Sequence, residues 1–141
     1  MKVLAFFGQQ QSGKTTAAQH LVTNKGWRRL SFADTLYDMM GVLISGNLRH
    51  QDKEVGQVPL EGKSIRYAMQ TLGTEWGRNM LGQNIWVTAM AQKLKALELT
   101  NANIVIDDCR FFNEYEMLQA FDCKFIKIVR PGLPDTVGSH A

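Results

Sequence analysis

One eight-residue segment near the start of the chain restricts its fold more than any other feature. Residues 8–15, GQQQSGKT, match the pattern G-x-x-x-x-G-K-[ST] in full. They follow a continuous apolar run at 2–7, typical of a buried strand, and precede a helical pattern at 13–22. A strand, a glycine-containing turn and a helix in this order form a phosphate-binding loop (P-loop), because backbone N–H groups and the helix N-terminus converge on phosphate oxygens.

The residue types within this loop predict its ligand. Lys14 can reach the β- and γ-phosphates of a nucleoside triphosphate, and the Thr15 hydroxyl can ligate Mg²⁺. We therefore expect ATP and Mg²⁺ to bind here. A chance match is disfavoured by the strand and helix on either side, while a loop that binds without turnover is left open. The expected nucleotide-binding residues are Gly8, Ser12, Gly13, Lys14, Thr15 and Thr16.

The remainder of the chain alternates strand and helix patterns. Apolar runs predict strands at 27–32, 103–106 and 124–129, and helical spacing predicts helices at 33–43, 63–72, 84–99 and 113–121. A polar, glycine-punctuated stretch at 45–62 is expected to be a mobile loop. This alternation predicts an α/β fold of three layers, the P-loop NTPase fold, with a parallel central sheet and helical acceptor and lid insertions. We expect one P-loop kinase domain over residues 1–141, with an acceptor-binding insertion at 45–82.

Composition and charge narrow the class of protein. The net charge of +3 and pI of about 9.0 suit a small polyanion without demanding nucleic acid. No apolar run approaches the roughly 20 residues of a membrane span, and the N-terminal run lacks a signal-peptide pattern. Cys109 and Cys123 have no metal-site spacing. We expect a cytoplasmic protein with no membrane and no stable nucleic-acid partner; a homodimer is left open.

An acidic element is expected at the end of a strand next to the P-loop strand. Residues 103–106 form an apolar run that ends in Asp107 and Asp108, and Arg110 follows. P-loop enzymes place a carboxylate at the end of a neighbouring strand to hold the magnesium shell, and a guanidinium beside it can clamp a phosphate. One of the two aspartates can instead cap a helix or lie in solvent.

The middle of the chain contains a candidate acceptor site. Arg66 and Gln70 are four residues apart and share a helix face, where an arginine can bind a phosphate and a glutamine can contact a base edge. Thr74 and Arg78 complete the candidate acceptor residues; we expect the helix to break at Gly73 and Thr74 to begin the next helix, which also carries Arg78. The alternative is a solvated helix face without a ligand.

Four segments in order resemble the deoxynucleoside monophosphate kinases of bacteriophages, within the wider nucleoside monophosphate kinase group. They are the P-loop, SFAD at 31–34, IRYAMQTLGTEWGR followed by NIWV, and VIDDCRFFNEYEML followed by IKIVRPG. The resemblance spans nearly the whole chain. The R-x-x-x-Q-x-x-G-T-E-x-x-R and D-x-R-F-x-N-E patterns are far more specific than the P-loop alone.

The resemblance implies a role for each matching residue. Asp108 matches the family aspartate, with Asp107 as a less usual neighbour, and Arg130 resembles the start of a lid. The implied catalytic residues are Lys14, Asp34, Arg110 and Arg130, the implied acceptor-site residues are Asp34, Arg66, Gln70 and Arg78, and the implied metal residues are Thr15 and Asp108.

Two positions depart from the family pattern. Asn84 stands where relatives often have an acidic residue, so no acidic role is expected there. The sequence also ends at Ala141, whereas relatives continue through a lid, a last strand and a helix. We expect a C-terminally shortened chain with a lid that begins near residue 130, or a natural variant.

The leading hypothesis is transfer of the γ-phosphoryl group of ATP to a (deoxy)nucleoside monophosphate, giving the diphosphate. A phosphate oxygen is already anionic, so Asp34 would orient the acceptor without removing a proton. Three alternatives are left open. They are a kinase for another acceptor, such as a coenzyme precursor or a sugar-like alcohol with Asp34 as base, a shortened nucleotide-binding domain without turnover, and, least favoured, a nucleic-acid 5′-kinase.

Overall fold

The computed structural model describes residues 1–9 and 11–132 and divides the chain into two compact units. The sheet unit comprises Met1–Phe32 and Met90–Ala141, and the helical unit comprises Ala33–Ala89. The helical unit includes the whole predicted acceptor segment at 45–82. The predicted lid lies largely at 133–141, outside the described residues, as does Gln10 of the P-loop.

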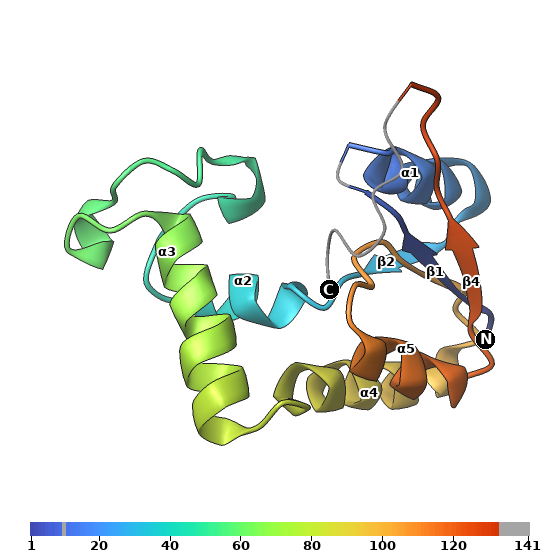
Figure 1. The fold of residues 1–141 in the computed structure, drawn as a ribbon. Coiled ribbons are helices and arrows are strands. Elements are labelled where there is room, and N and C mark those ends of the chain that lie inside the picture. The colour runs from blue at the N-terminus through green and yellow to red at the C-terminus, as the bar shows by residue number, and fades with distance from the viewer. Residues whose placement is uncertain (10, 133–141) are drawn as a thin grey trace. The chain divides into compact units, whose positions relative to one another are not determined.

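The sheet unit is a three-layer α/β fold, which confirms the predicted fold class (Figure 1). Its strands run parallel in the order β2-β3-β1-β4, and α1 covers one face of the sheet while α5 and the last part of α4 cover the other. The bounds are β1 Val3–Phe7, α1 Lys14–Lys25, β2 Arg28–Leu30, α4 Ile85–Leu97, the 3-10 turn η4 Glu98–Thr100, β3 Ile104–Ile106, α5 Phe112–Gln119 and β4 Lys124–Lys127.

The two central strands, β1 and β3, are continuously apolar because helices cover both faces of the sheet, whereas the edge strands β2 and β4 contain charged residues. Side chains that alternate along β1 and β3 enter different layers of the core. One layer packs under α4 and α5, and contains Val3, Ala5, Ile104, Ile106, Met90, Leu94 and Leu118. The other layer packs under α1, and contains Phe6, Val105 and Ala18. The result is a rigid sheet whose carboxyl edge carries the P-loop and the two aspartates.

The helical unit has its own smaller core of Met40, Ile44, Leu48 and Ile65. Its elements are α2 Asp34–Met40, the 3-10 turns η1 Leu48–His50 and η2 Val58–Leu60, α3 Ile65–Gln70 and the π-helix η3 Thr71–Leu81, and it also contains the start of α4. The predicted loop at 45–62 is thus irregular chain with two short helical turns. Within the described residues, no helix combines the length and hydrophobicity required to cross a bilayer.

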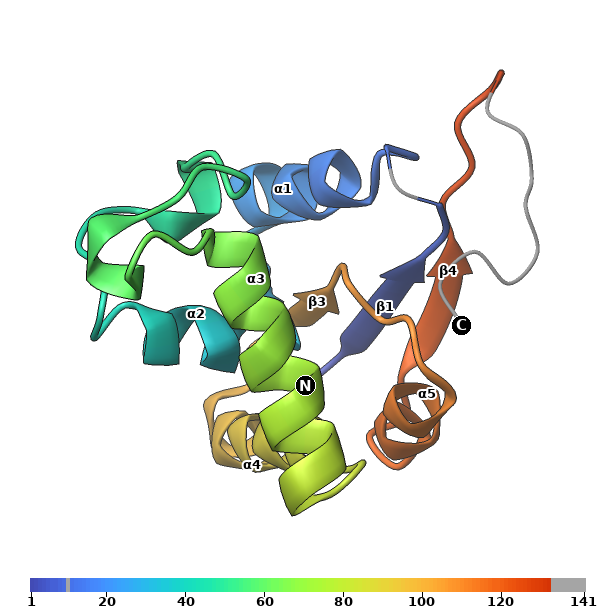
Figure 2. The ribbon, with the colours of Figure 1, turned by 60° about the vertical axis from the view of Figure 1, so that its left-hand side comes forward.

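The predicted helix break at Gly73 is wrong. The chain continues from α3 into η3 as one uninterrupted helix (Figure 2). Gly73 is buried, and a Cβ built there would lie 3.2 Å from Leu36 Cδ1. A Cβ at Gly77 would lie 2.5 Å from the Trp86 ring. The glycines therefore allow close packing of the helix and do not end it.

The start of α5 also differs from the prediction, which began this helix at residue 113. The helix begins at Phe112, so Asn113 is already inside it. The buried Glu114 carboxylate accepts hydrogen bonds from the backbone N–H groups of Arg110 (2.8 Å) and Phe111 (2.9 Å). Glu114 thus satisfies the helix N-terminus and fixes the backbone that carries Arg110.

Candidate active site

The P-loop has the backbone shape that its sequence predicts. Gly8 and Gly13 have φ values of 140° and 104°, which residues with a Cβ rarely adopt. A Cβ at Gly8 would also lie 2.5 Å from the Ile128 carbonyl oxygen. The Ser12 hydroxyl is buried and has no hydrogen-bond partner among the described residues. Glycines with positive φ and close backbone packing, together with a buried hydroxyl that has no partner, suit a loop that binds phosphate oxygens.

Lys14 lies at the first position of α1, at the centre of this cradle. Its Nζ donates to the Gly8 carbonyl oxygen at 2.6 Å. Burial, and then the Arg110 guanidinium, hold the pKa of Lys14 below its usual value, while Asp107 and Asp108 act in the opposite direction. Lys14 is therefore within electrostatic range of the predicted arginine and both aspartates.

The other loop residues surround this lysine. Thr15 and Thr16 are exposed in the first turn of α1, where their hydroxyls remain accessible. Arg130 Nη1 donates to the Gln11 carbonyl oxygen at 3.4 Å. The structure thus brings Arg130 against the P-loop, although it follows β4 in the sequence.

The two aspartates after β3 have different surroundings. Asp107 is buried and accepts from Arg29 Nε at 2.7 Å and Nη2 at 2.6 Å, both through Oδ2. Its Oδ1 has no hydrogen-bond partner in the part of the chain that the structure describes. Asp108 is half-buried and accepts from the Phe32 backbone N–H at 2.9 Å. Arg29 thus anchors Asp107, and Phe32 orients Asp108.

These groups fit a magnesium ion bound with a nucleotide. No cluster of three His, Cys, Asp or Glu side chains in the described residues could hold a metal alone. Mg²⁺ bound with a nucleotide takes most ligands from phosphates and water and needs only one or two protein oxygens. The Thr15 hydroxyl, the Asp108 carboxylate and the unpartnered Asp107 Oδ1 supply oxygens of that kind.

The predicted acceptor residues all belong to the helical unit. Arg66 and Gln70 are exposed on α3, and Thr74 and Arg78 lie on η3. Arg66 forms an ion pair with Glu54 in the irregular segment before α3. Both side chains of this pair are largely exposed, so it contributes little stability and Arg66 can exchange Glu54 for a ligand.

Asp34, at the first position of α2, accepts a hydrogen bond from Arg49. The Arg49 guanidinium also lies over the Tyr37 ring, 4.1 Å from its centroid. Arg49 could not be predicted as a site residue, because it lies in a polar segment without a motif. It adds a cation beside the predicted acceptor carboxylate.

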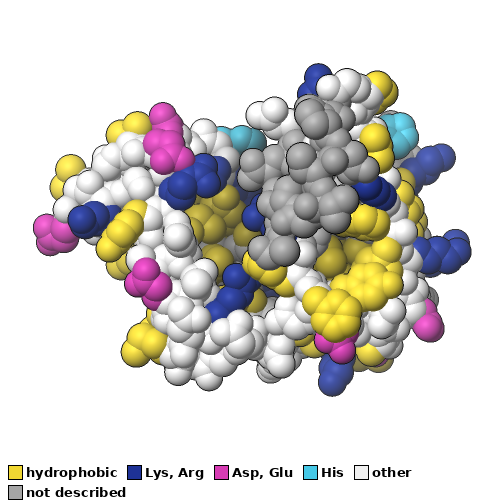
Figure 3. Space-filling view, in the orientation of Figure 1, with side chains coloured by type: hydrophobic (Ala, Val, Ile, Leu, Met, Phe, Trp, Pro, Cys, Tyr) yellow, Lys and Arg dark blue, Asp and Glu magenta, His cyan; other side chains and the backbone are white. Residues whose placement is uncertain are grey.

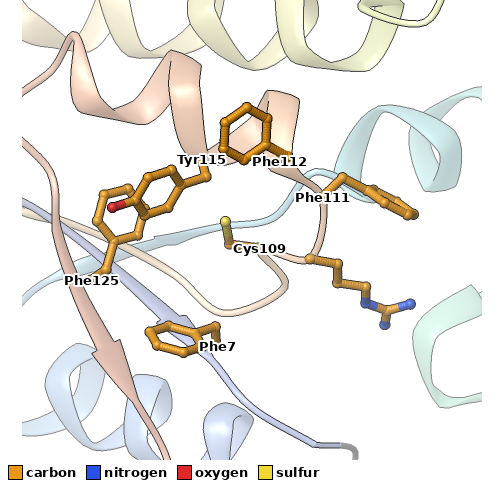
Figure 4. Close-up of a pocket in the computed structure, with 7 residues that line it drawn as sticks. Phe7, Cys109, Phe111, Phe112, Tyr115 and Phe125 are labelled. Carbon is orange, nitrogen blue, oxygen red and sulfur yellow. The ribbon is translucent and has the colours of Figure 1, made fainter. Parts of the chain in front are cut away.

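A separate cavity of about 520 Å³ lies in the sheet unit. Figure 4 shows aromatic rings around the Cys109 thiol, with Phe7 on one side and the Tyr115 and Phe125 rings close together. The Tyr115 and Phe125 centroids are 4.1 Å apart. Hydrophobic side chains gather at the surface around α5 (Figure 3). Among the described residues that line the cavity, Arg110 alone is charged and most of the others are aromatic.

Both cysteine thiols should react slowly. Burial, with smaller contributions from Glu114, Cys123 and Asp108, raises the pKa of Cys109 to about 12. Burial also raises the pKa of Cys123 to about 12, although a hydrogen bond with the Ala5 backbone lowers it. Because the thiolate is the nucleophile, we expect alkylation by iodoacetamide at pH 7.5 to be at least about a hundredfold slower than that of glutathione.

The alkylation rate should rise about tenfold for each pH unit up to pH 10, as the thiolate fraction grows. The control is the same protein in urea, where both thiols should react at the rate of a free cysteine. Rapid labelling of the folded protein at pH 7.5 would contradict this prediction.

The fold and the site together define a class. A parallel sheet in the order β2-β3-β1-β4, with a complete P-loop after β1 and carboxylates after β3, is that of a P-loop phosphotransferase. The family model described as deoxynucleotide monophosphate kinase matches residues 38–141. A protein of Acanthamoeba polyphaga mimivirus, provisionally named a deoxynucleotide monophosphate kinase, is 31% identical over an alignment 147 positions long with its gaps. The match covers 94% of this chain and 76% of that protein.

The chain therefore belongs to the deoxynucleotide monophosphate kinase family. This confirms the predicted family and the predicted enzyme class, a kinase. In three dimensions the chain is similar to the crystal structure of a protein from Chloroflexus aurantiacus J-10-fl that is provisionally described as a kinase. The TM-score is 0.50 at 16% identity, with 91% of this chain covered, and the chain spans 59% of that protein's length. This likeness supports the fold.

Proposed function

We propose that this protein transfers the γ-phosphoryl group of ATP, bound with Mg²⁺, to a deoxynucleoside 5′-monophosphate and so produces the diphosphate. The observation that carries the proposal is the position of Lys14. It lies in a complete P-loop, donates to Gly8, and is within electrostatic range of Asp107, Asp108 and Arg110. A lysine, a first-turn threonine and a carboxylate after the neighbouring strand are the groups that hold the triphosphate and its metal.

On the donor side, backbone N–H groups of the P-loop bind phosphate oxygens, and Lys14 binds the β- and γ-phosphates. Thr15 and Asp108 would hold the metal. Bound Mg²⁺ would supply positive charge that offsets the negative charge of the phosphates. Arg110 and Arg130 would stabilise the charge that develops on the transferred group. The Glu114 carboxylate accepts from the Arg110 backbone N–H, and Arg130 Nη1 donates to the Gln11 carbonyl oxygen of the P-loop.

On the acceptor side, the attacking atom is a phosphate oxygen that is already anionic at neutral pH. No side chain needs to remove a proton, so positioning and charge neutralisation supply the catalysis. Arg66 and Arg78 would bind the acceptor phosphate, and Gln70 would contact a base edge. Asp34, held by Arg49, would orient the acceptor.

The test is a panel of the four deoxynucleoside 5′-monophosphates, their ribose counterparts and a non-nucleotide alcohol, each with ATP and Mg²⁺. We expect ADP and the matching diphosphate to form in equal amounts with at least one deoxynucleotide, and EDTA to stop the reaction. Transfer only to the alcohol would overturn the acceptor assignment. ATP binding without transfer to any acceptor would leave only a nucleotide-binding role.

Replacing Arg66 by alanine should weaken binding of the acceptor monophosphate and leave ATP binding unchanged. Loss of one charged hydrogen bond costs about 1.5–3 kcal/mol, roughly ten- to a hundredfold in acceptor affinity. Titration of ATP and of the preferred monophosphate against Arg66→Ala would measure both. Lys63→Ala is the matched control, because Lys63 is an exposed cation just before α3.

Glu54→Ala provides a second comparison, since it frees Arg66 from its ion pair without removing the guanidinium. We expect this variant to bind the monophosphate as well as the wild type or better. If Arg66→Ala weakens the binding of ATP and of the monophosphate equally, or weakens neither, this helix face is solvated and binds no acceptor.

A further inference from the structure

A buried tryptophan is hydrogen-bonded to the π-helix of the helical unit and packs against it. Trp86, in the first turn of α4, donates from Nε1 to the Gly73 carbonyl oxygen at 2.8 Å, within the protein interior. Its ring also lies against Gly77, where an added Cβ would be 2.5 Å from Cζ2. Trp86 is only 6% exposed. One indole thus contacts two successive turns of η3 and leaves no space for a side chain on the second.

The change from α3 to η3 alters which side chains share a helix face. In an α-helix of 3.6 residues per turn, each step of four residues drifts by about 40° around the axis. A π-helix, with i→i+5 bonds and about 4.4 residues per turn, drifts by about 30° in the opposite direction. The hydrogen bond from the Gly82 N–H to the Gly77 carbonyl oxygen, 3.0 Å, is of this i→i+5 type.

These opposite drifts align residues at a spacing of four. From Arg66 to Gln70, on α3, the side-chain direction rotates by about 40° around the helix axis. Across Thr74 and Arg78, on η3, each step of four rotates it by about 30° in the opposite direction. All four side chains then fall within an arc of about 70°, whereas a continuous α-helix would spread them over about 120°.

Burial along the helix follows the same spacing. Ile65, Gly73 and Gly77 are buried, and Met69 is partly buried against the small core. The stripe one residue further on is exposed at Arg66, Gln70 and Thr74 and half-buried at Arg78. A packed stripe with a four-residue repeat therefore lies beside a polar stripe with the same repeat.

We propose that Trp86 is a positioning residue for the acceptor: by fastening Gly73 and Gly77 it maintains the π-helix that places Thr74 and Arg78 in line with Arg66 and Gln70. This inference rests on the proposed acceptor site. A row of two guanidiniums, an amide and a hydroxyl about 12–18 Å long suits an extended anionic ligand such as a nucleoside monophosphate.

The first test is Trp86→Phe, which removes the N–H donor and keeps an aromatic ring. We expect the KM for the preferred deoxynucleoside monophosphate to rise about tenfold, while the KM for ATP stays within about twofold. Gly77→Ala should have the same effect by displacing the indole. Trp27→Phe and Gly82→Ala are the matched controls, since Trp27 lies in the sheet unit and no atom lies within 4 Å of a Cβ at Gly82.

The second test asks whether Trp86 acts through Arg78. In an Arg66→Ala background, Trp86→Phe should still raise the acceptor KM about tenfold, because Arg66 precedes the π-helix. In an Arg78→Ala background the same change should have little effect, because the displaced group is already absent. A loss of stability alone would lower the amount of active enzyme equally in both backgrounds.

The outcomes separate this inference from the proposed function. If the wild type phosphorylates none of the deoxynucleotides, the proposed function fails. If the wild type is active and the folded Trp86→Phe and Gly77→Ala variants have the acceptor KM of their controls, Trp86 has only a packing role. If thermal melting shows that one of these two variants does not fold, the acceptor KM of the other variant tests the inference.

Discussion

Replacing Lys14 by alanine is expected to lower turnover at least about a hundredfold while the protein stays folded. In the proposed mechanism Lys14 would donate to the transferred phosphoryl group, and loss of one such preorganised donor typically costs about 10²–10³ in rate. Its side chain donates to the Gly8 carbonyl oxygen and is not part of either hydrophobic layer of the sheet unit. Melting temperature should therefore change little.

The matched control is Lys25→Ala, which removes the same charge from the last turn of the same helix, away from the P-loop. Single-turnover rates with ATP and the preferred monophosphate would measure the chemical step, and Lys14→Arg would show whether a charge of different shape suffices. A folded Lys14→Ala enzyme with near-normal turnover would refute the assignment of the donor site.

The fold could be predicted because its signals are local and periodic. Residues 104–106 are apolar, residues 124–127 contain two adjacent apolar side chains, and the P-loop has a fixed spacing between strand and helix. Element bounds differ by one to a few residues, as at β4, which ends at Lys127 although the prediction continued to 129. The terminal residues of an element depend on hydrogen bonds that sequence patterns do not encode.

The helix through Gly73 could not be predicted because its cause is not local. Glycine is a common helix terminator, so the sequence favoured a break. The actual reason for glycine at 73 and 77 is close contact with Leu36 and Trp86, which are distant in the sequence. The same holds for the ion pairs of the site. Neither the Arg29–Asp107 pair nor the Asp34–Arg49 pair has a motif, because each depends on how the elements pack.

The predicted site residues separate into two groups by unit. Gly8, Lys14, Asp108, Arg110 and Arg130 lie in the sheet unit, where hydrogen bonds or electrostatic interactions connect them to the P-loop. The acceptor candidates lie in the helical unit, on one helix and at the start of α2. Their catalytic and binding roles stay predictions, and the kinetic experiments above test them separately for donor and acceptor.

Replacing Arg29 by alanine is expected to destabilise the protein by about 3 kcal/mol, at the lower end of the range for breaking a buried ion pair. Asp107 is only 4% exposed, and Arg29 is the cation that its Oδ2 contacts. Without the guanidinium, the carboxylate would be buried and would lose the cation that is hydrogen-bonded to it, while its Oδ1 already has no partner among the described residues. Arg29 is itself partly exposed, which favours the lower value.

Urea denaturation of the protein without nucleotide or metal would measure this loss, and Arg28→Ala is the matched control. Arg28 is the neighbouring residue on β2 and is exposed, so its replacement should change the free energy of unfolding by no more than about 0.5 kcal/mol. Adding Asp107→Asn to Arg29→Ala should recover part of the stability, because an amide carries no charge to bury. Equal stability of Arg29→Ala and Arg28→Ala would mean that the Asp107 carboxylate finds another donor or reaches water, and that Arg29 does not anchor the acidic side of the site.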